Sequence, residues 1–240
     1  MSNKPQIIYN TDFGIHNGKS QDEKDKKGSW RDLRTIILIP CYSKGIHPRI
    51  VENWSYIMSP MNQAVVRIFM TDMEVGQAYT QAIEMILQNP ILKDFPFIAT
   101  LEHDNLVQPD WLLKTYEDMD KFDVVGTIYY TKGEYGKPMC YGDPNAPYYD
   151  MQPFEPKPND VTPCNGLGMG ATVFKSEIFK NTLLQKPYFE TKQEFKEGVG
   201  AKAYTQDLYF FENARKLGYK FGCTTKTKCG HLDLETGIVW

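Results

Sequence analysis

The run from Phe97 to Leu101 limits the fold more than any other stretch, because it is apolar without polar alternation. Such a run predicts a strand that is buried on both faces, as in the middle of an α/β sheet. The run ends at Glu102 and Asp104, and Pro109 then suits the first turn of a new helix. Ligands of open α/β sheets bind beyond the carboxyl ends of the strands, so both carboxylates lie where a ligand is expected.

Glu102 and Asp104 are two anionic oxygen donors separated by one residue. This arrangement suits a hard divalent cation, which commonly shares its remaining positions with substrate phosphates. The simpler interpretation is a polar turn after a strand, and the two residues alone do not decide between these interpretations. The rest of the chain favours the metal site.

Strand-like and helix-like segments alternate around this run. Strands are predicted at residues 35–39, 64–70, 97–101 and 122–130, and helices after residue 48, from 74 to 88, and from 109 to about 119. This order is typical of βαβ units and predicts an α/β fold with a mostly parallel central sheet flanked by helices.

The second half of the chain is less regular. Residues 131–160 are rich in proline and tyrosine, which predicts a functional or disordered excursion whose aromatic faces either stack on sugars and bases or pack as a loop. Residues 164–175 are dense in glycine but match neither a dinucleotide fingerprint nor a P-loop. The polar residues 186–203 are interpreted as a mobile lid. Thr205 is a natural N-cap for a helix that ends at Gly218, and Tyr219–Cys223 follows as the last strand.

Composition sets the broad class of the protein. The 240 residues are assigned to a single catalytic domain, 34–240, and a peripheral N-terminal arm, 1–33. Residues 17–28 are charged without an apolar side chain, which predicts a solvated loop or a mobile arm, while Ile7–Tyr9 can add an edge strand.

A net charge of -3 does not favour a nucleic-acid binder. No apolar run approaches the roughly 20 residues of a transmembrane helix, and the N-terminus lacks a signal core.

The five cysteines are odd in number and contain no C-x-x-C pair, which favours a reducing compartment and a cytoplasmic protein over a disulfide framework. A zinc site at Cys223, Cys229 and His231 is disfavoured, because their spacing matches no common zinc motif.

Three features occur in an informative order: an opening strand that ends in Pro40, the E-x-D pair followed by P-D-W-L, and T-Q-D-L-Y-F before a terminal G-H-L-D. Over residues 34–233 the chain resembles the GT-A fold glycosyltransferases, most closely the family 2-like inverting enzymes. The resemblance implies that Glu102 and Asp104 hold Mn²⁺ or Mg²⁺ on the diphosphate of a nucleotide sugar, with His231 completing the metal shell. It also implies that Asp207 is the general base. The chain departs from the family pattern at two positions. Glu102 stands at the first position of the acidic motif, where the family usually has Asp, and Gln206 precedes Asp207 where the family often has Glu.

Further positions follow from the same resemblance. Pro40, Cys41 and Tyr42 match the segment that meets the nucleotide base, and residues 72–79, which include Asp72 and Gln77, fall where the family contacts base or ribose. Lys226 and Lys228 are expected to add positive charge beside the metal, with a solvated basic turn as the alternative. Asp207 lies in the first turn of a helix, whose dipole favours its anion, so it is expected to be charged at neutral pH.

Together these features predict a metal-dependent glycosyltransferase that moves a sugar, with inversion, from a UDP- or GDP-sugar to a hydroxyl of a glycan or other acceptor. A nucleotidyltransferase that forms a nucleotide sugar is one alternative. That class is expected to carry a Gly-rich phosphate loop with Lys or Arg after the first strand, and Pro40–Gly45 matches this pattern poorly. A non-catalytic nucleotide- or sugar-binding module is the other.

Overall fold

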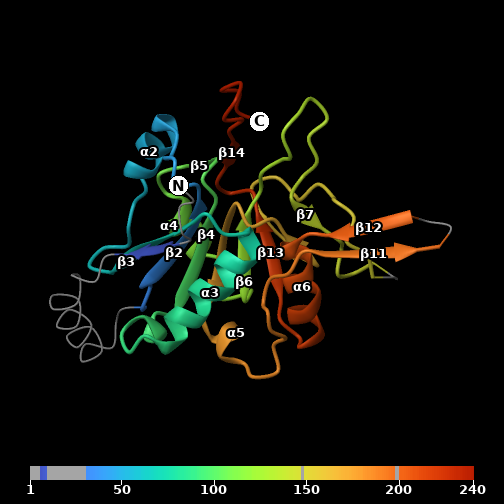
Figure 1. Ribbon diagram of the computed structural model, residues 1–240, viewed down its shortest axis with the longest axis horizontal. Helices are drawn as coiled ribbons and strands as arrows, with labels where there is room; N and C mark the ends of the chain where they lie inside the picture. The colour runs from blue at the N-terminus through green and yellow to red at the C-terminus, as the bar shows by residue number, and fades with distance from the viewer. Residues whose placement is uncertain (1–5, 10–30, 147–148, 198–199) are drawn as a thin grey trace.

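A central sheet of eight strands organises the computed structural model, which describes residues 6–9, 31–146, 149–197 and 200–240 (Figure 1). Across the sheet the strands are β1 (Gln6–Tyr9), β3 (Val65–Thr71), β2 (Thr35–Cys41), β4 (Phe97–Leu101), β10 (Ala171–Lys175), β6 (Val124–Thr127), β13 (Phe221–Thr224) and β8 (Val161–Cys164). All five residues of β4 are buried, which confirms the strand predicted at the middle of the sheet.

Most strands of this sheet point the same way. β2 pairs in parallel with both β3 and β4, and β6 pairs in parallel with β13. β10 lies antiparallel between β4 and β6, so these two strands share one direction. The mostly parallel α/β sheet is therefore confirmed, with β1, β10 and β8 as its antiparallel members. β1 also confirms the edge strand predicted at Ile7.

Helices cover both faces of the sheet. α3 (Val75–Gln88) and α6 (Gln206–Lys216) pack on one face, together with the short α5 (Glu177–Lys180). α2 (Pro48–Ser55) and α4 (Trp111–Tyr116) pack on the other. Alternate residues of β2 serve the two cores, since Ile36 and Leu38 face the first and Ile37 and Ile39 the second. A 3-10 turn, η1 (Leu92–Asp94), follows α3.

Three small ribbons complete the described part of the chain. β5 (Asn105–Val107) pairs with β14 (Cys229–His231), and β7 (Cys140–Tyr141) pairs with β9 (Gly166–Leu167). β11 (Lys192–Lys196) and β12 (Gly200–Tyr204) pair antiparallel within residues 186–203, a strand pair that the sequence did not predict. Because β11 and β12 pair only with each other in the described structure, they need no apolar face. The alternation of apolar and polar residues that predicts a strand is therefore weak in this segment. Its action as a lid stays a prediction.

The N-terminal arm is described only in part. Residues 1–5 and 10–30, including the charged segment predicted to be solvated or mobile, lie outside the described residues. The division into an arm and a domain at residues 33 and 34 stays a prediction. Among the helices that are described, none is both long and apolar enough to cross a bilayer.

Candidate active site

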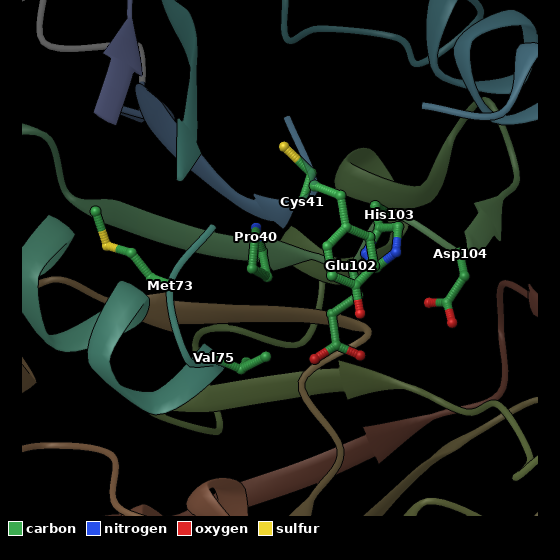
Figure 2. A pocket seen from close by; sticks show the side chains of 8 residues that line it. Pro40, Cys41, Met73, Val75, Glu102, His103 and Asp104 are labelled. Atoms are coloured by element: carbon green, nitrogen blue, oxygen red, sulfur yellow. The ribbon is translucent and has the colours of Figure 1, made fainter. Parts of the chain in front are cut away.

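A pocket opens at the carboxyl ends of β2 and β4, where the sequence predicts a ligand (Figure 2). Its lining comes from three segments that are distant in sequence: Pro40, Cys41 and Tyr42 at the end of β2, Met73 and Val75 at the start of α3, and Glu102, His103 and Asp104 after β4. The two acidic residues therefore lie beside the segment predicted to meet a nucleotide base.

A tight turn after β4 holds the acidic pair in place. The backbone N–H of Glu102 donates to the Gly170 carbonyl at 3.1 Å, and the N–H of Asn105 donates to the Glu102 carbonyl at 3.0 Å. Gly170 has no room for a side chain, because a Cβ there would lie 2.7 Å from both Asn105 Nδ2 and Tyr129 Cζ. The glycine thus lets the Asn105 and Tyr129 side chains pack directly against the backbone that accepts from Glu102.

Asp104 lies at the centre of a charged cluster. Its Oδ2 accepts a hydrogen bond from Lys132 Nζ at 2.7 Å and lies 3.2 Å from His231 Nε2. His231 Nδ1 lies 2.9 Å from the carbonyl oxygen of Tyr130. A carbonyl oxygen can only accept, so Nδ1 carries the hydrogen and donates it. Nε2 faces Asp104 Oδ2: it donates to the carboxylate when it carries a hydrogen, and it offers its lone pair to a metal when it does not.

This arrangement fits a divalent metal. A ligating histidine commonly donates its other ring N–H to a backbone carbonyl, as His231 does to Tyr130. Carboxylate oxygen and imidazole nitrogen are ligands that Mn²⁺ and related metals accept. Within the described residues, no group of three or more His, Cys, Asp and Glu side chains is arranged to hold an ion. Asp104 and His231 would therefore share such a metal with substrate oxygens and water.

The two carboxyl groups of the E-x-D pair have opposite pKa shifts. Burial raises the pKa of Glu102 to about 8, and the negative charges of Asp104 and Asp207 add to this effect. Burial also acts to raise the pKa of Asp104, but hydrogen bonds from His231 and Lys132 outweigh it and lower the pKa to about 2. At neutral pH and without a metal, Asp104 is therefore an anion while Glu102 holds a proton. Glu102 Oε1 accepts a long hydrogen bond, 3.5 Å, from the Tyr79 hydroxyl.

Asp207 is the buried carboxylate in the first turn of α6, two residues after the N-cap Thr205. Its Oδ1 accepts hydrogen bonds from the Thr205 hydroxyl and from the Leu208 N–H, the latter at 2.9 Å. Burial raises the pKa of Asp207 despite these bonds, which is opposite to the effect expected from the helix dipole alone. Its charge acts on Glu102 and also raises the pKa of Tyr79, so Asp207 belongs to the same electrostatic cluster.

The predicted base-binding residues meet at the entrance of the pocket. Tyr42 is 63% exposed, and its ring contacts His103 edge to face at 5.1 Å between centroids. The Cys41 thiol points away from the two carboxylates (Figure 2). Asp72 has a positive φ of 56° and accepts a hydrogen bond from the Ser43 N–H at 3.2 Å. Among the described residues its buried Oδ2 has no hydrogen-bond partner, and Asp72 itself is not part of the pocket lining, although the next residue, Met73, is.

Three predicted residues lie elsewhere. Lys226 Nζ pairs with the buried Asp118 at 2.6 Å, beyond the end of α4. Lys228 lines a second pocket with Tyr130 and Trp240, rather than the one beside Glu102 and Asp104. Gln77 lines a third pocket with Phe189 and Thr191, because α3 turns its side chain outward. The structure does not bring these three side chains to the pocket beside Glu102 and Asp104, and their part in donor binding stays a prediction.

Sequence reasoning missed two members of the site. Lys132 belongs to the loop after β6 and lies on no motif, so no local signal marks it. Tyr79 was included only as the last residue of the segment 72–79 expected to contact base or ribose, and the reach of its hydroxyl to Glu102 was not predicted. His103, between the two acidic residues, lines the pocket and could have been included for that position alone.

Comparisons with known proteins agree with this architecture. No protein-family model and no curated protein sequence matches the chain. Among solved structures, A197 from STIV superposes with a TM-score of 0.58 at 21% identity, over 84% of this chain and 87% of that chain. GalNAc-T7, solved with UDP, GalNAc and Mn²⁺, superposes with a TM-score of 0.50 at 11% identity, over 84% of this chain and 44% of that chain. The protein therefore has a GT-A-like glycosyltransferase fold.

Proposed function

We propose that the protein is a metal-dependent glycosyltransferase that moves a sugar from a UDP- or GDP-sugar to the hydroxyl of a glycan or other acceptor, with inversion. The observation that carries this proposal is the pairing of His231 with Asp104, which lines the pocket at the carboxyl edge of the sheet. Its five free thiols suit the cytoplasm, where we expect it to act.

Asp104 and His231 would hold Mn²⁺ or Mg²⁺, with Glu102 beside them. A bound divalent ion would offset the negative charge that develops on the departing nucleoside diphosphate. Asp104 is already an anion at neutral pH, whereas Glu102 must release its proton to contribute charge.

Asp207 would accept the proton of the acceptor hydroxyl as it attacks the anomeric carbon. A general base needs to be within hydrogen-bond reach of that proton and to have a pKa nearer to the working pH than an exposed carboxylate. Burial moves the pKa of Asp207 in this direction. Hydrogen bonds from the Thr205 hydroxyl and the Leu208 N–H hold Oδ1 in place. The other oxygen, Oδ2, would then face the acceptor hydroxyl.

Tyr42 and His103 would contact the nucleoside, since their rings line the entrance of the pocket. Asp72, whose neighbour Met73 lines the pocket, would also contact the base or the ribose.

A thermal-shift screen tests the proposal. UDP, GDP, CDP and their sugars are each added with Mn²⁺ or with chelator, and a ligand at a hundred times its Kd stabilises the fold by about 2.7 kcal/mol. We expect stabilisation by one nucleotide family that requires Mn²⁺. No shift with any ligand would contradict a donor site.

Product analysis then separates the remaining functions. Transfer of the sugar to an acceptor with inverted anomeric configuration supports the proposal, and retained configuration would contradict inversion. Formation of pyrophosphate from a nucleoside triphosphate and a sugar phosphate would indicate the nucleotidyltransferase. Mn²⁺-dependent binding without turnover of any donor would indicate a binding module.

A further inference from the structure

Lys132 forms the shortest hydrogen bond to the Asp104 side chain among the described residues, and the motifs of the chain do not account for it. Its ammonium lies 2.7 Å from Asp104 Oδ2, the same oxygen that faces His231 Nε2. The ammonium thus lies at the carboxylate oxygen that a metal held by Asp104 and His231 would use. Lys132 is also 35% exposed, so its long stem is free to move.

The loop that carries Lys132 is anchored to the site at its base. The Tyr130 carbonyl accepts the hydrogen bond from His231, and Lys132 follows two residues later. Thr131 and Lys137 close the loop, with the Thr131 N–H bound to the Lys137 carbonyl at 2.9 Å and the Lys137 N–H bound to Thr131 Oγ1 at 2.8 Å. The loop therefore keeps Lys132 beside Asp104 while leaving its side chain mobile.

A metal ion and the ammonium compete for Asp104. A divalent ion binds a carboxylate oxygen at about 2.1 Å, so it would lie within a few ångströms of an ammonium held at the same oxygen. Repulsion between the two cations displaces the one that is on a flexible stem. The new anion within reach is then the diphosphate of the donor, which a lysine binds as a point charge.

We propose that Lys132 neutralises Asp104 in the metal-free protein and transfers its ammonium to the donor diphosphate when the metal binds. This inference rests on the proposed function and assigns a diphosphate-binding residue to it. The proposal predicts two effects of opposite sign on affinity: Lys132 weakens the binding of the metal and strengthens the binding of the diphosphate.

Calorimetric titration of Lys132→Met against wild type measures both effects. Mn²⁺ alone should bind the variant about threefold more tightly, because a partly exposed ion pair no longer competes. UDP or GDP with saturating Mn²⁺ should bind about tenfold more weakly, because a charge-assisted hydrogen bond is lost. Uridine and guanosine lack phosphates, and their affinities should not change. Lys137→Met is the matched control, since it removes an exposed ammonium from the same loop.

The outcomes are distinct. Weaker binding of both Mn²⁺ and the diphosphates by Lys132→Met, or unchanged binding of either, would overturn the role of Lys132 while leaving the donor site intact. Equal changes in Lys137→Met would overturn it as well, since any charge on the loop would then suffice. Wild-type protein that binds neither Mn²⁺ nor UDP nor GDP would overturn the proposed function together with this inference.

Discussion

Asp104 Oδ2 and His231 Nε2 lie 3.2 Å apart although 127 positions separate the two residues. The backbone brings them together, because β5 and β14 pair His231 with Asn105, the residue that follows Asp104. The Leu232 N–H also donates to the Asp104 carbonyl at 2.7 Å. The two side chains therefore meet because a strand pair holds them in register, which is the preorganisation that a metal site needs.

Asp104→Asn tests this pair. The amide keeps the size of the side chain but removes the charge that a divalent ion requires, so Mn²⁺-dependent nucleotide binding should be lost. Thermal shift with UDP and GDP, in Mn²⁺ and in chelator, measures the effect. Asp120→Asn is the control, because Asp120 is 76% exposed and pairs only at the surface with Arg31. A variant at Asp104 that retains the Mn²⁺-dependent shift would contradict the assignment of this ligand.

The sequence predicts the parts of the fold that depend on local pattern. The buried run Phe97–Leu101 and the β-branched run from Thr35 to Ile39 both form central strands, since continuous apolar runs are typical of strands buried on both faces. The carboxyl end of β4 then places Glu102 and Asp104 at the ligand-binding edge of the sheet, because the carboxyl ends of parallel strands lie at the same edge.

The side-chain positions that the sequence did not predict depend on side-chain direction and on long-range pairing. Lys226 lies only five residues before His231 in sequence, yet the chain turns it toward Asp118. Gln77 lies in the expected segment but on the outward side of α3. Lys132 reaches Asp104 through a loop whose course depends on its anchor at His231. No periodicity in the sequence carries this information.

Asp207→Asn should separate binding from turnover. The amide keeps an oxygen for the Thr205 hydroxyl and the Leu208 N–H but cannot accept the proton of an acceptor hydroxyl. Loss of a general base typically lowers the rate by about 10²–10⁴-fold. Donor affinity by calorimetry should stay at the wild-type value while sugar transfer falls. Turnover at the wild-type rate would show that another group is the base.

Glu102 should make the metal-free protein less stable as pH rises. Its pKa is raised from 4.5 to about 8, so between these values the folded state holds a proton that the unfolded state has lost. The free energy of unfolding then falls with increasing pH across this window. Urea unfolding in chelator at pH 5, 6, 7 and 8 measures the slope.

Glu102→Gln is the matched variant for this pH dependence. Glutamine is neutral at every pH, so the slope between about pH 5 and pH 8 should become flatter than in wild type. Asp104 does not contribute in this window, because its pKa is lowered to about 2 and it is ionised throughout. The same slope in both proteins would show that Glu102 does not hold the proton.

Lys226→Met should affect stability and leave nucleotide binding unchanged. Lys226 Nζ lies 2.6 Å from Asp118 Oδ1, and the Asp118 side chain is only 1% exposed. Removal of the ammonium leaves a buried carboxylate without its partner, which typically costs about 3 kcal/mol. Urea unfolding at neutral pH should show this loss, whereas Lys228→Met should change stability by no more than about 0.5 kcal/mol.

The double variant Lys226→Met/Asp118→Asn identifies the cause of that loss. If an unpaired charge destabilises Lys226→Met, removal of the Asp118 charge should restore much of the stability, because a neutral amide is far less costly to bury than a carboxylate. If the double variant is as unstable as the single one, lost packing of the Lys226 stem is responsible instead. A Lys226→Met protein of wild-type stability that no longer binds UDP or GDP would return Lys226 to the donor site.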